Sequence, residues 1–209
     1  CVPDRENTKL AMSPSFAGPW DFDDYYTKLH KWGIECVPTY STHSKRDPKD
    51  QVCDSTDPYN YYSYAAMLWQ IVARYGSNKD IDPDLIQVAD GQEKKIGLGV
   101  MKALEPLNEP DGTWLGRIPY YTPFEHAAFL SMCYDGHEGM YKNVGVKQAD
   151  PNFKMSMSGG AGLNSNYIRA MQLWCKYNRK DGKLPFDAIN AHCYCGKKLD
   201  EAGIAKLVD

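Results

Sequence analysis

The sequence predicts an α/β protein built on parallel strands. Segments with apolar residues at helical spacing alternate along the chain with short, continuous apolar segments. Strict alternation of this kind implies parallel strands that are joined by helical crossovers. The expected strands are apolar along much of their length, which is typical of strands with both faces covered.

The composition is that of an ordinary globular protein, and it argues against several classes. The 209 residues are 43% hydrophobic and 24% charged, with a net charge of −3, and no linker divides them, so we expect one domain over residues 1–209. No apolar run approaches the roughly 20 residues that a membrane-spanning helix needs, so no membrane span is expected. The chain carries no basic stripe, so we expect no nucleic-acid partner.

The start of the chain and its cysteines give two further expectations. The sequence begins at Cys1 without a methionine or a signal sequence, so either something was removed or this is an internal piece. The seven cysteines are irregularly spaced and form no Cys-x-x-Cys pair. A zinc ribbon or thioredoxin-type motif is therefore not expected, and most cysteines should be buried thiols.

Four elements are expected in the first half of the chain: helices over 20–32 and 59–75, and strands over 34–40 and 100–109. Asp21 or Asp23 can cap the first helix, and Gly33 ends it. The second helix has the strongest apolar face in the chain and ends at Gly76. A long polar loop separates it from the central strand.

Five elements are expected in the second half: helices over 123–134, 164–177 and 199–208, and strands over 154–158 and 186–194. Thr122 can cap the first of these helices, with Glu125 near the capping-box position, and a break is expected near Gly136. Asn164 or Ser165 can cap the next helix.

Two short motifs at strand ends resemble one enzyme family. Glu105-Pro106-Leu107-Asn108-Glu109-Pro110 is similar to the fourth-strand motif of the clan A glycoside hydrolases, and Asn190-Ala191-His192-Cys193-Tyr194 is similar to their sixth-strand His-x-Tyr pattern. These enzymes are (β/α)8-barrel retaining glycosidases. Glu105, four residues before Glu109, also fits the subgroup that contains β-xylosidases and α-iduronidases. The resemblance spans roughly residues 20–200 and is specific only at the two strand ends.

The resemblance implies a role for each matched residue. Glu109 would be the catalytic general acid/base, and Asn108 would bind the sugar 2-hydroxyl. His192 and Tyr194 would face the substrate and the nucleophile. The implied partner is a carbohydrate substrate in an oligo- or polysaccharide, with no cofactor and no metal, and the implied location is extracytoplasmic: periplasmic, cell-surface or secreted.

The chain departs from the family in its extent. A whole barrel needs about 250 residues and eight strands, whereas four strands are expected here, corresponding to strands three to six. In this family the nucleophile is a Glu on strand seven, which would lie outside the chain. The fold expected is therefore an incomplete TIM-type (β/α)8 barrel of about four βα units. Its partners would be the remaining barrel segments of a larger chain, and without them it should be inactive.

Alternation along the last strand decides which side chains share a face. Asn190, His192 and Tyr194 fall on one side, expected to face the barrel axis, while Cys193 and Cys195 fall on the other. His192 cannot easily share a metal ion or a thiolate with cysteines on the opposite face. This pattern argues against a zinc site and against a Cys–His thiol enzyme.

Other polar and aromatic residues receive more local interpretations. Glu105 faces the same side as Glu109 and is interpreted as a structural carboxylate that needs a cationic or hydrogen-bonding partner. Asp111 lies in the turn, where it either caps or binds substrate at the rim. Trp114 follows the central strand and can stack on a sugar ring. Three tryptophans on helical stripes are expected in the core: Trp32, Trp69 and Trp174.

Two other functions remain open from the sequence. The first is a catalytically inactive, carbohydrate-binding barrel, which keeps Trp114 but needs no second carboxylate. The second is a nucleotide- or phosphate-binding α/β protein that uses the loop Gly159-Gly160-Ala161-Gly162 before a helix. That loop lacks both common phosphate-binding patterns, and a plain strand-to-helix turn is the favoured interpretation.

Overall fold

The fold was obtained as a computed structural model, which describes residues 21–40, 55–114, 116, 120–162 and 164–192. Its sheet has three parallel strands in the order β1-β2-β3. The strands are β1 (Ala103–Leu104), β2 (Lys154–Gly160) and β3 (Ala188–Ala191). The prediction of a mixed α/β protein with parallel strands is therefore confirmed.

A fourth segment lies beside β1 but makes only an isolated bridge. Thr39 pairs in parallel with Glu105, and the Tyr40 and Glu105 amides donate to the carbonyls of Glu105 and Pro38, both over 2.9 Å. The strands expected over 34–40 and 100–109 are thus shorter than predicted. Pro38 and Pro106 explain this, because proline has no N–H to donate to a ladder.

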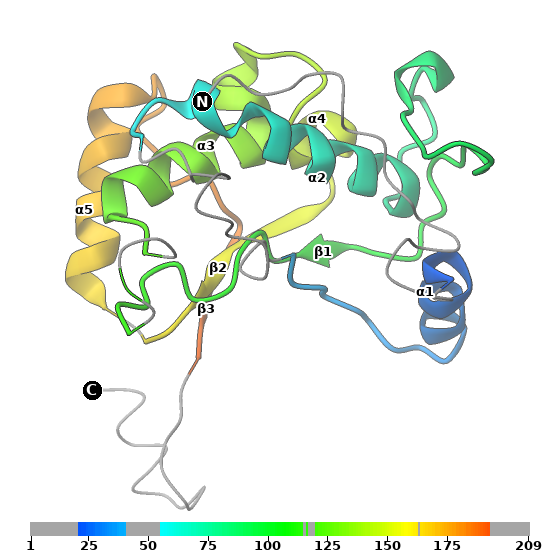
Figure 1. Cartoon of the computed structure of the whole chain (residues 1–209), viewed down its shortest axis with the longest axis horizontal. Helices are drawn as coiled ribbons and strands as arrows, with labels where there is room; N and C mark the ends of the chain where they lie inside the picture. The colour runs from blue at the N-terminus through cyan, green and yellow to red at the C-terminus, as the bar shows by residue number, and fades with distance from the viewer. Residues whose placement is uncertain (1–20, 41–54, 115, 117–119, 163, 193–209) are drawn as a thin grey trace, which may run out of the picture.

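The helices lie mainly on one side of this sheet, as Figure 1 shows for α2, α3 and α4 above the strands and α5 at their left. Their bounds are α1 (Phe22–Lys31), α2 (Tyr62–Tyr75), α3 (Pro123–Gly139), α4 (Val146–Ala149) and α5 (Ser165–Asn178), with short 3-10 turns η2 (Pro58–Tyr61) and η3 (Pro83–Leu85). The expected helix over 199–208 lies outside the described residues. Within the described part of the chain, no helix combines the length and apolar character that crossing a membrane requires.

The predicted helix caps are confirmed where the structure describes them. The Asp21 side chain accepts the Asp24 amide at the start of α1. Thr122 and Glu125 form a complete capping box at α3. Asn164 caps α5. The break expected near Gly136 is also present, as left-handed backbone through Glu138.

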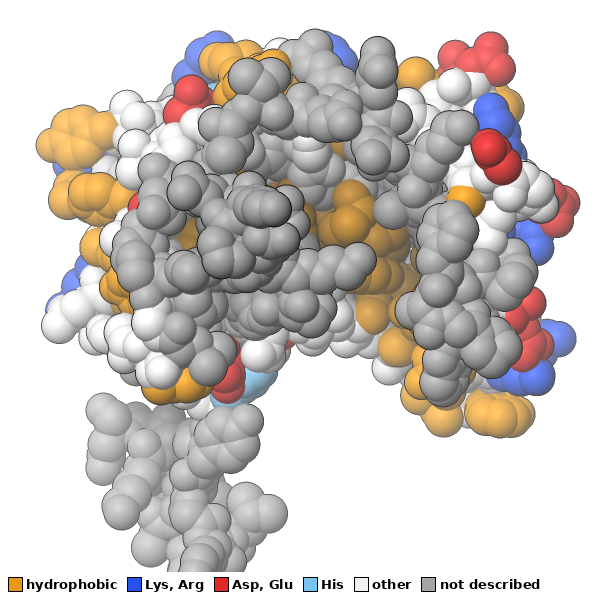
Figure 2. Space-filling model, viewed as in Figure 1, with side chains coloured by type: hydrophobic (Ala, Val, Ile, Leu, Met, Phe, Trp, Pro, Cys, Tyr) orange, Lys and Arg blue, Asp and Glu red, His pale blue; other side chains and the backbone are white. Residues whose placement is uncertain are grey.

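The hydrophobic core lies between the sheet and its helices. Trp69 and Trp174 are buried there as predicted, whereas Trp32 is 70% exposed, so its assignment to the core was wrong. A helical stripe identifies a common face but does not show that another element covers it. Figure 2 shows hydrophobic side chains exposed at the α1 end of the molecule. The exposed apolar residues of this segment are Tyr25, Trp32, Ile34 and Val37.

A buried ion pair holds α1 against α2. The Arg74 guanidinium donates two hydrogen bonds to Asp23, of 2.8 and 2.6 Å, and the Lys95 ammonium lies 2.9 Å from the same carboxylate. The side chains of Arg74 and Asp23 are only 3% and 10% exposed. Burial alone would raise the pKa of Asp23, but the hydrogen bonds from Arg74 and Lys95 outweigh it and lower the pKa to about 2.

This lowered pKa predicts a pH dependence of stability. Because the pKa of Asp23 is lower in the folded than in the unfolded chain, its contribution is fully present above about pH 4 and is lost as the pH falls through about 2. The difference corresponds to about 2 kcal/mol. Urea unfolding of the protein and of Asp23→Asn, at pH 6 and at pH 2, should show a smaller acid-induced loss of unfolding free energy in the variant. Equal losses in both proteins would contradict the prediction.

Candidate active site

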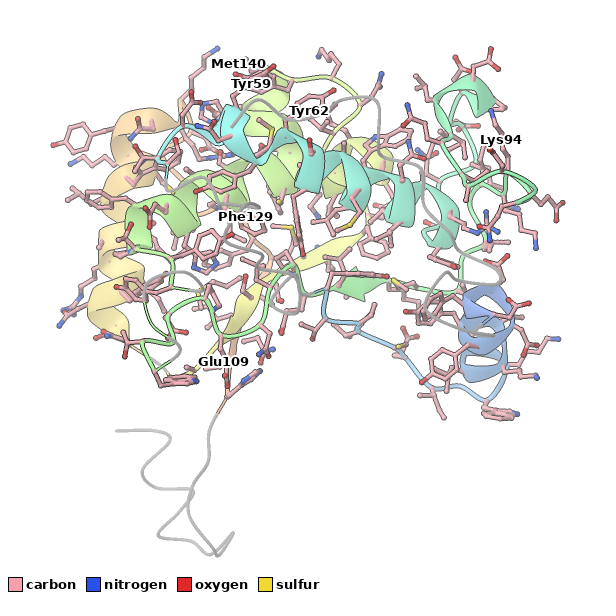
Figure 3. The ribbon with its side chains drawn as sticks, in the orientation of Figure 1. Tyr59, Tyr62, Lys94, Glu109, Phe129 and Met140 are labelled. Atoms are coloured by element: carbon pink, nitrogen blue, oxygen red, sulfur yellow. The ribbon has the colours of Figure 1, made fainter. Side chains whose placement is uncertain are left out.

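Glu109 lies where the central segment leaves the sheet. Asn108 makes a parallel bridge with Gly159, and the Glu109 amide donates to the Gly159 carbonyl over 2.6 Å. The chain then turns, with the Gly112 amide donating to the Glu109 carbonyl over 3.0 Å. Figure 3 shows Glu109 at the lower margin of the molecule, on the opposite side of the view from the labelled tyrosines of η2 and α2. The predicted position at the carboxyl end of a strand segment is confirmed.

The backbone of Glu109 is strained. Its φ of 48° falls in the left-handed region, which non-glycine residues adopt at a cost of about 1–2 kcal/mol. A second non-glycine residue with positive φ, Ser158 at 111°, precedes its partner Gly159. Strain of this kind concentrates at functional sites, where the surrounding structure enforces it.

His192 meets Glu109 across the sheet. The imidazole Nδ1 lies 2.8 Å from Glu109 Oε1, although the two residues are 83 positions apart in sequence. The His192 amide donates to the Gly160 carbonyl over 2.7 Å, which fixes the backbone that carries the ring. The side chains of His192 and Glu109 remain 27% and 19% exposed. The two strand-end motifs thus converge on one partly exposed point.

Behind this pair, Glu105 is a buried carboxylate, only 3% exposed. Thr39 Oγ1 donates to its Oε1 over 3.1 Å, and Asn190 Nδ2 donates to its Oε2. These contacts confirm that Asn190 and His192 point to the side of the sheet that Glu105 and Glu109 face. They also supply the hydrogen-bonding partners that the structural interpretation of Glu105 required.

The remaining predicted site residues are only partly placed together. Asn108 lies next to Glu109 and is partly exposed. Trp114 is 62% exposed. Its ring lies over the Cα of Gly112, two residues earlier in the turn after Glu109. With Asp111 it lines a shallow, open pocket whose other side is formed by Ala161, Gly162, Asn164 and Ser165. Tyr194 lies outside the described residues.

The glycine-rich segment differs from its prediction. Gly159 and Gly160 belong to β2, which runs to Gly160 instead of ending at residue 158. Asp111 Oδ1 accepts the Ala161 amide over 2.7 Å, and Asn164 Oδ1 accepts two amides at the start of α5. These oxygens hold the N–H groups that a phosphate would need, and a carboxylate repels an anion, so the contacts argue against a phosphate site.

A polar cluster in the core supports this segment, and the sequence reasoning missed it. His126 Nε2 lies 3.0 Å from Ser158 Oγ, and Nδ1 lies 3.3 Å from the hydroxyl of Tyr167. Burial lowers the pKa of His126 to about 3, so the ring is neutral. Ser158 is fully buried at an irregularity of the β2–β3 register. No spacing in the sequence marks these residues, because they come from three separate elements.

Thiols and metal-binding clusters do not define a second site in the described ranges. There, no group of three or more His, Cys, Asp or Glu residues is placed to hold a metal ion. Cys36, Cys133 and Cys175 are free thiols, and the last two are buried. Burial raises the pKa of the Cys133 thiol well above its ordinary value, which makes it a poor nucleophile. Cys193 and Cys195 lie outside the described residues.

Comparison with models of protein families, with curated proteins and with solved structures finds no match to this chain.

Proposed function

We propose that this chain is part of a (β/α)8-barrel retaining glycoside hydrolase in which Glu109 is the general acid/base. The observation that carries the proposal is the 2.8 Å contact between Glu109 and His192. Each residue belongs to one of the two motifs that resemble clan A glycosidases, and the fold brings both motifs to the same end of the sheet. Independent turn-forming segments have no reason to converge in this way.

The order of the strands supports a barrel. The segment at Thr39, β1, β2 and β3 pair in chain order, each parallel to the next. Because crossovers between parallel strands are right-handed, a sheet that grows in one direction places its helices on one side. That arrangement curls into a barrel, whereas a doubly wound sheet reverses direction and is covered on both faces. Apolar side chains remain exposed at both edges, with Val37 at one and Ile189 at the other.

In a barrel these edges would pair with further segments of a larger chain. Those segments would also bring the second carboxylate, because a retaining mechanism needs two carboxyl groups about 5–5.5 Å apart. Glu109 would protonate the leaving glycosidic oxygen as the nucleophile attacks the anomeric carbon. It would then take a proton from the water that hydrolyses the glycosyl-enzyme intermediate.

The substrate proposed is an oligo- or polysaccharide. Asn108 and His192 lie beside the proposed acid/base and would bind sugar hydroxyls there, and Tyr194 follows in the same strand motif. Trp114 offers an exposed ring face at the rim of the neighbouring open pocket, suited to stacking on a sugar. We also propose an extracytoplasmic location, which rests on the resemblance alone.

The test is hydrolysis of a panel of 4-nitrophenyl glycosides by the protein that contains this chain. The expected result is cleavage of at least one glycoside, with the initial sugar product retaining the anomeric configuration by NMR. Hydrolysis with inversion would contradict the retaining mechanism. Binding of an oligosaccharide without turnover would contradict the enzyme and favour the non-catalytic carbohydrate-binding barrel.

A further inference from the structure

Glu105 is placed to do more than stabilise the sheet. Its carboxylate is buried directly behind the Glu109–His192 pair, and its partners come from the segments on either side: Thr39 before β1 and Asn190 in β3. A carboxylate accepts hydrogen bonds but donates none when ionised. It therefore imposes one orientation on each polar group that approaches it.

Gly159 leaves a space that is bordered both by this carboxylate and by the imidazole of His192. A Cβ on Gly159 would collide with His192 Nε2, would lie 2.9 Å from its Cε1 and would lie 2.7 Å from Glu105 Oε1. Both groups therefore border the same small volume over the Cα of Gly159. The same residue accepts the Glu109 amide, so the position that seats the imidazole also fixes the backbone of Glu109.

We propose that Glu105 is a positioning residue: through its hydrogen bond from Asn190, two residues before His192 in the chain, and together with the bare Cα of Gly159, it holds the His192 imidazole so that Nδ1–H is donated to Glu109 Oε1. Nδ1 is the ring nitrogen that lies within hydrogen-bond distance of a carboxylate, Glu109 Oε1, and this contact favours a proton on Nδ1. Glu109 Oε1 is then occupied as an acceptor. Oε2 is left as the oxygen that carries the transferable proton.

We call Glu105, Gly159, His192 and Glu109 the support array. Its catalytic role rests on the proposed function, but its geometry does not. A support of this kind orients an acid/base group in the same way that outer ligands orient a metal-bound histidine. Small displacements of catalytic groups lower turnover strongly. In the active protein, Glu105→Gln should therefore lower kcat by roughly 10- to 100-fold with little change in KM.

The direct test is NMR of the protein with 15N-labelled imidazole rings. The chain has five histidines, and His192→Gln identifies the signal of His192. In the unsubstituted protein we expect the 15N signal of His192 Nδ1 to be that of a protonated nitrogen whose proton exchanges slowly with water. In both Glu105→Gln and Gly159→Ala that signal should shift to the averaged value of a free imidazole. Gly160→Ala is the matched control, because a Cβ there has its nearest neighbour at 3.3 Å and none of its nearest neighbours belongs to His192 or Glu105.

A second signal in the same spectra reports whether β2 stays folded. His126 contacts Ser158, immediately before Gly159, and its buried ring should keep its signal in every variant. If Gly159→Ala also displaces the His126 signal, the strand itself is damaged and Glu105→Gln alone decides. An unchanged His192 signal in Glu105→Gln, or an equal loss in Gly160→Ala, would overturn the proposal. Glycosidase activity without the expected Nδ1 signal would refute this array only, whereas the signal without activity would refute the glycosidase function only.

Discussion

Replacement of Glu109 by glutamine is expected to lower the hydrolysis of unactivated glycosides by about 10²- to 10⁴-fold, the range typical for loss of a general acid/base. Glutamine has the same shape and can still accept a hydrogen bond from His192, but it can neither give the leaving group a proton nor take one from water. The effect should fall on kcat, because protonation of the leaving group stabilises the transition state more than the bound substrate.

The stability of Glu109→Gln should stay within about 1 kcal/mol of the original, since the side chain lies at a partly open site and keeps its backbone contacts. Glu93→Gln is the matched control, because the side chain of Glu93 is 75% exposed and is placed on the polar loop before β1. Steady-state kinetics should show no change in that control. Full activity of Glu109→Gln would remove Glu109 from the mechanism.

The second large effect concerns the ion pair between α1 and α2. Asp23→Ala is expected to lower the free energy of unfolding by about 3–5 kcal/mol, because it leaves the Arg74 guanidinium buried without its carboxylate. Arg74 would keep its hydrogen bond to the Glu93 carbonyl but would lose both hydrogen bonds to Asp23. Urea unfolding followed by circular dichroism measures the difference.

Asp24→Ala provides the control for that experiment. Asp24 is the neighbouring residue in the same first turn of α1 and pairs with Lys28, but both side chains are more than half exposed. Its removal should therefore cost no more than about 0.5 kcal/mol. Since both residues are acidic and near the helix N-terminus, the comparison cancels their effect on the helix dipole. Similar losses in the two variants would show that the buried pair does not hold α1 in place.

The sequence was sufficient for features that depend on local pattern. The apolar stripes located α2 and α5 within a few residues, and the caps at Asp21, Thr122 and Asn164 follow from side chains that bind nearby amides. Alternation in the last strand correctly placed Asn190 and His192 on one face. In each case the information lies within a few positions of the residue concerned.

Features that depend on distant partners were not accessible in the same way. The exposure of Trp32 depends on what covers its helix face, and no periodicity records that. The ladder at β1 is limited to Ala103–Leu104, and Pro106, which follows it, has no N–H to extend it. The backbone at Ser158 is irregular and contacts His126 from another element, and β2 runs to Gly160 where a turn was predicted.

Chemical rescue of Glu109→Ala tests the central claim most directly. Dinitrophenolate is a leaving group that needs no protonation, and azide is a nucleophile that needs no general base. With dinitrophenyl glycosides, we predict that Glu109→Ala in the protein containing this chain forms the intermediate, accumulates it, and turns over faster when azide is added. The product should be a glycosyl azide with retained configuration. Turnover that azide does not change, and a product free of azide, would contradict the assignment of Glu109 as the acid/base.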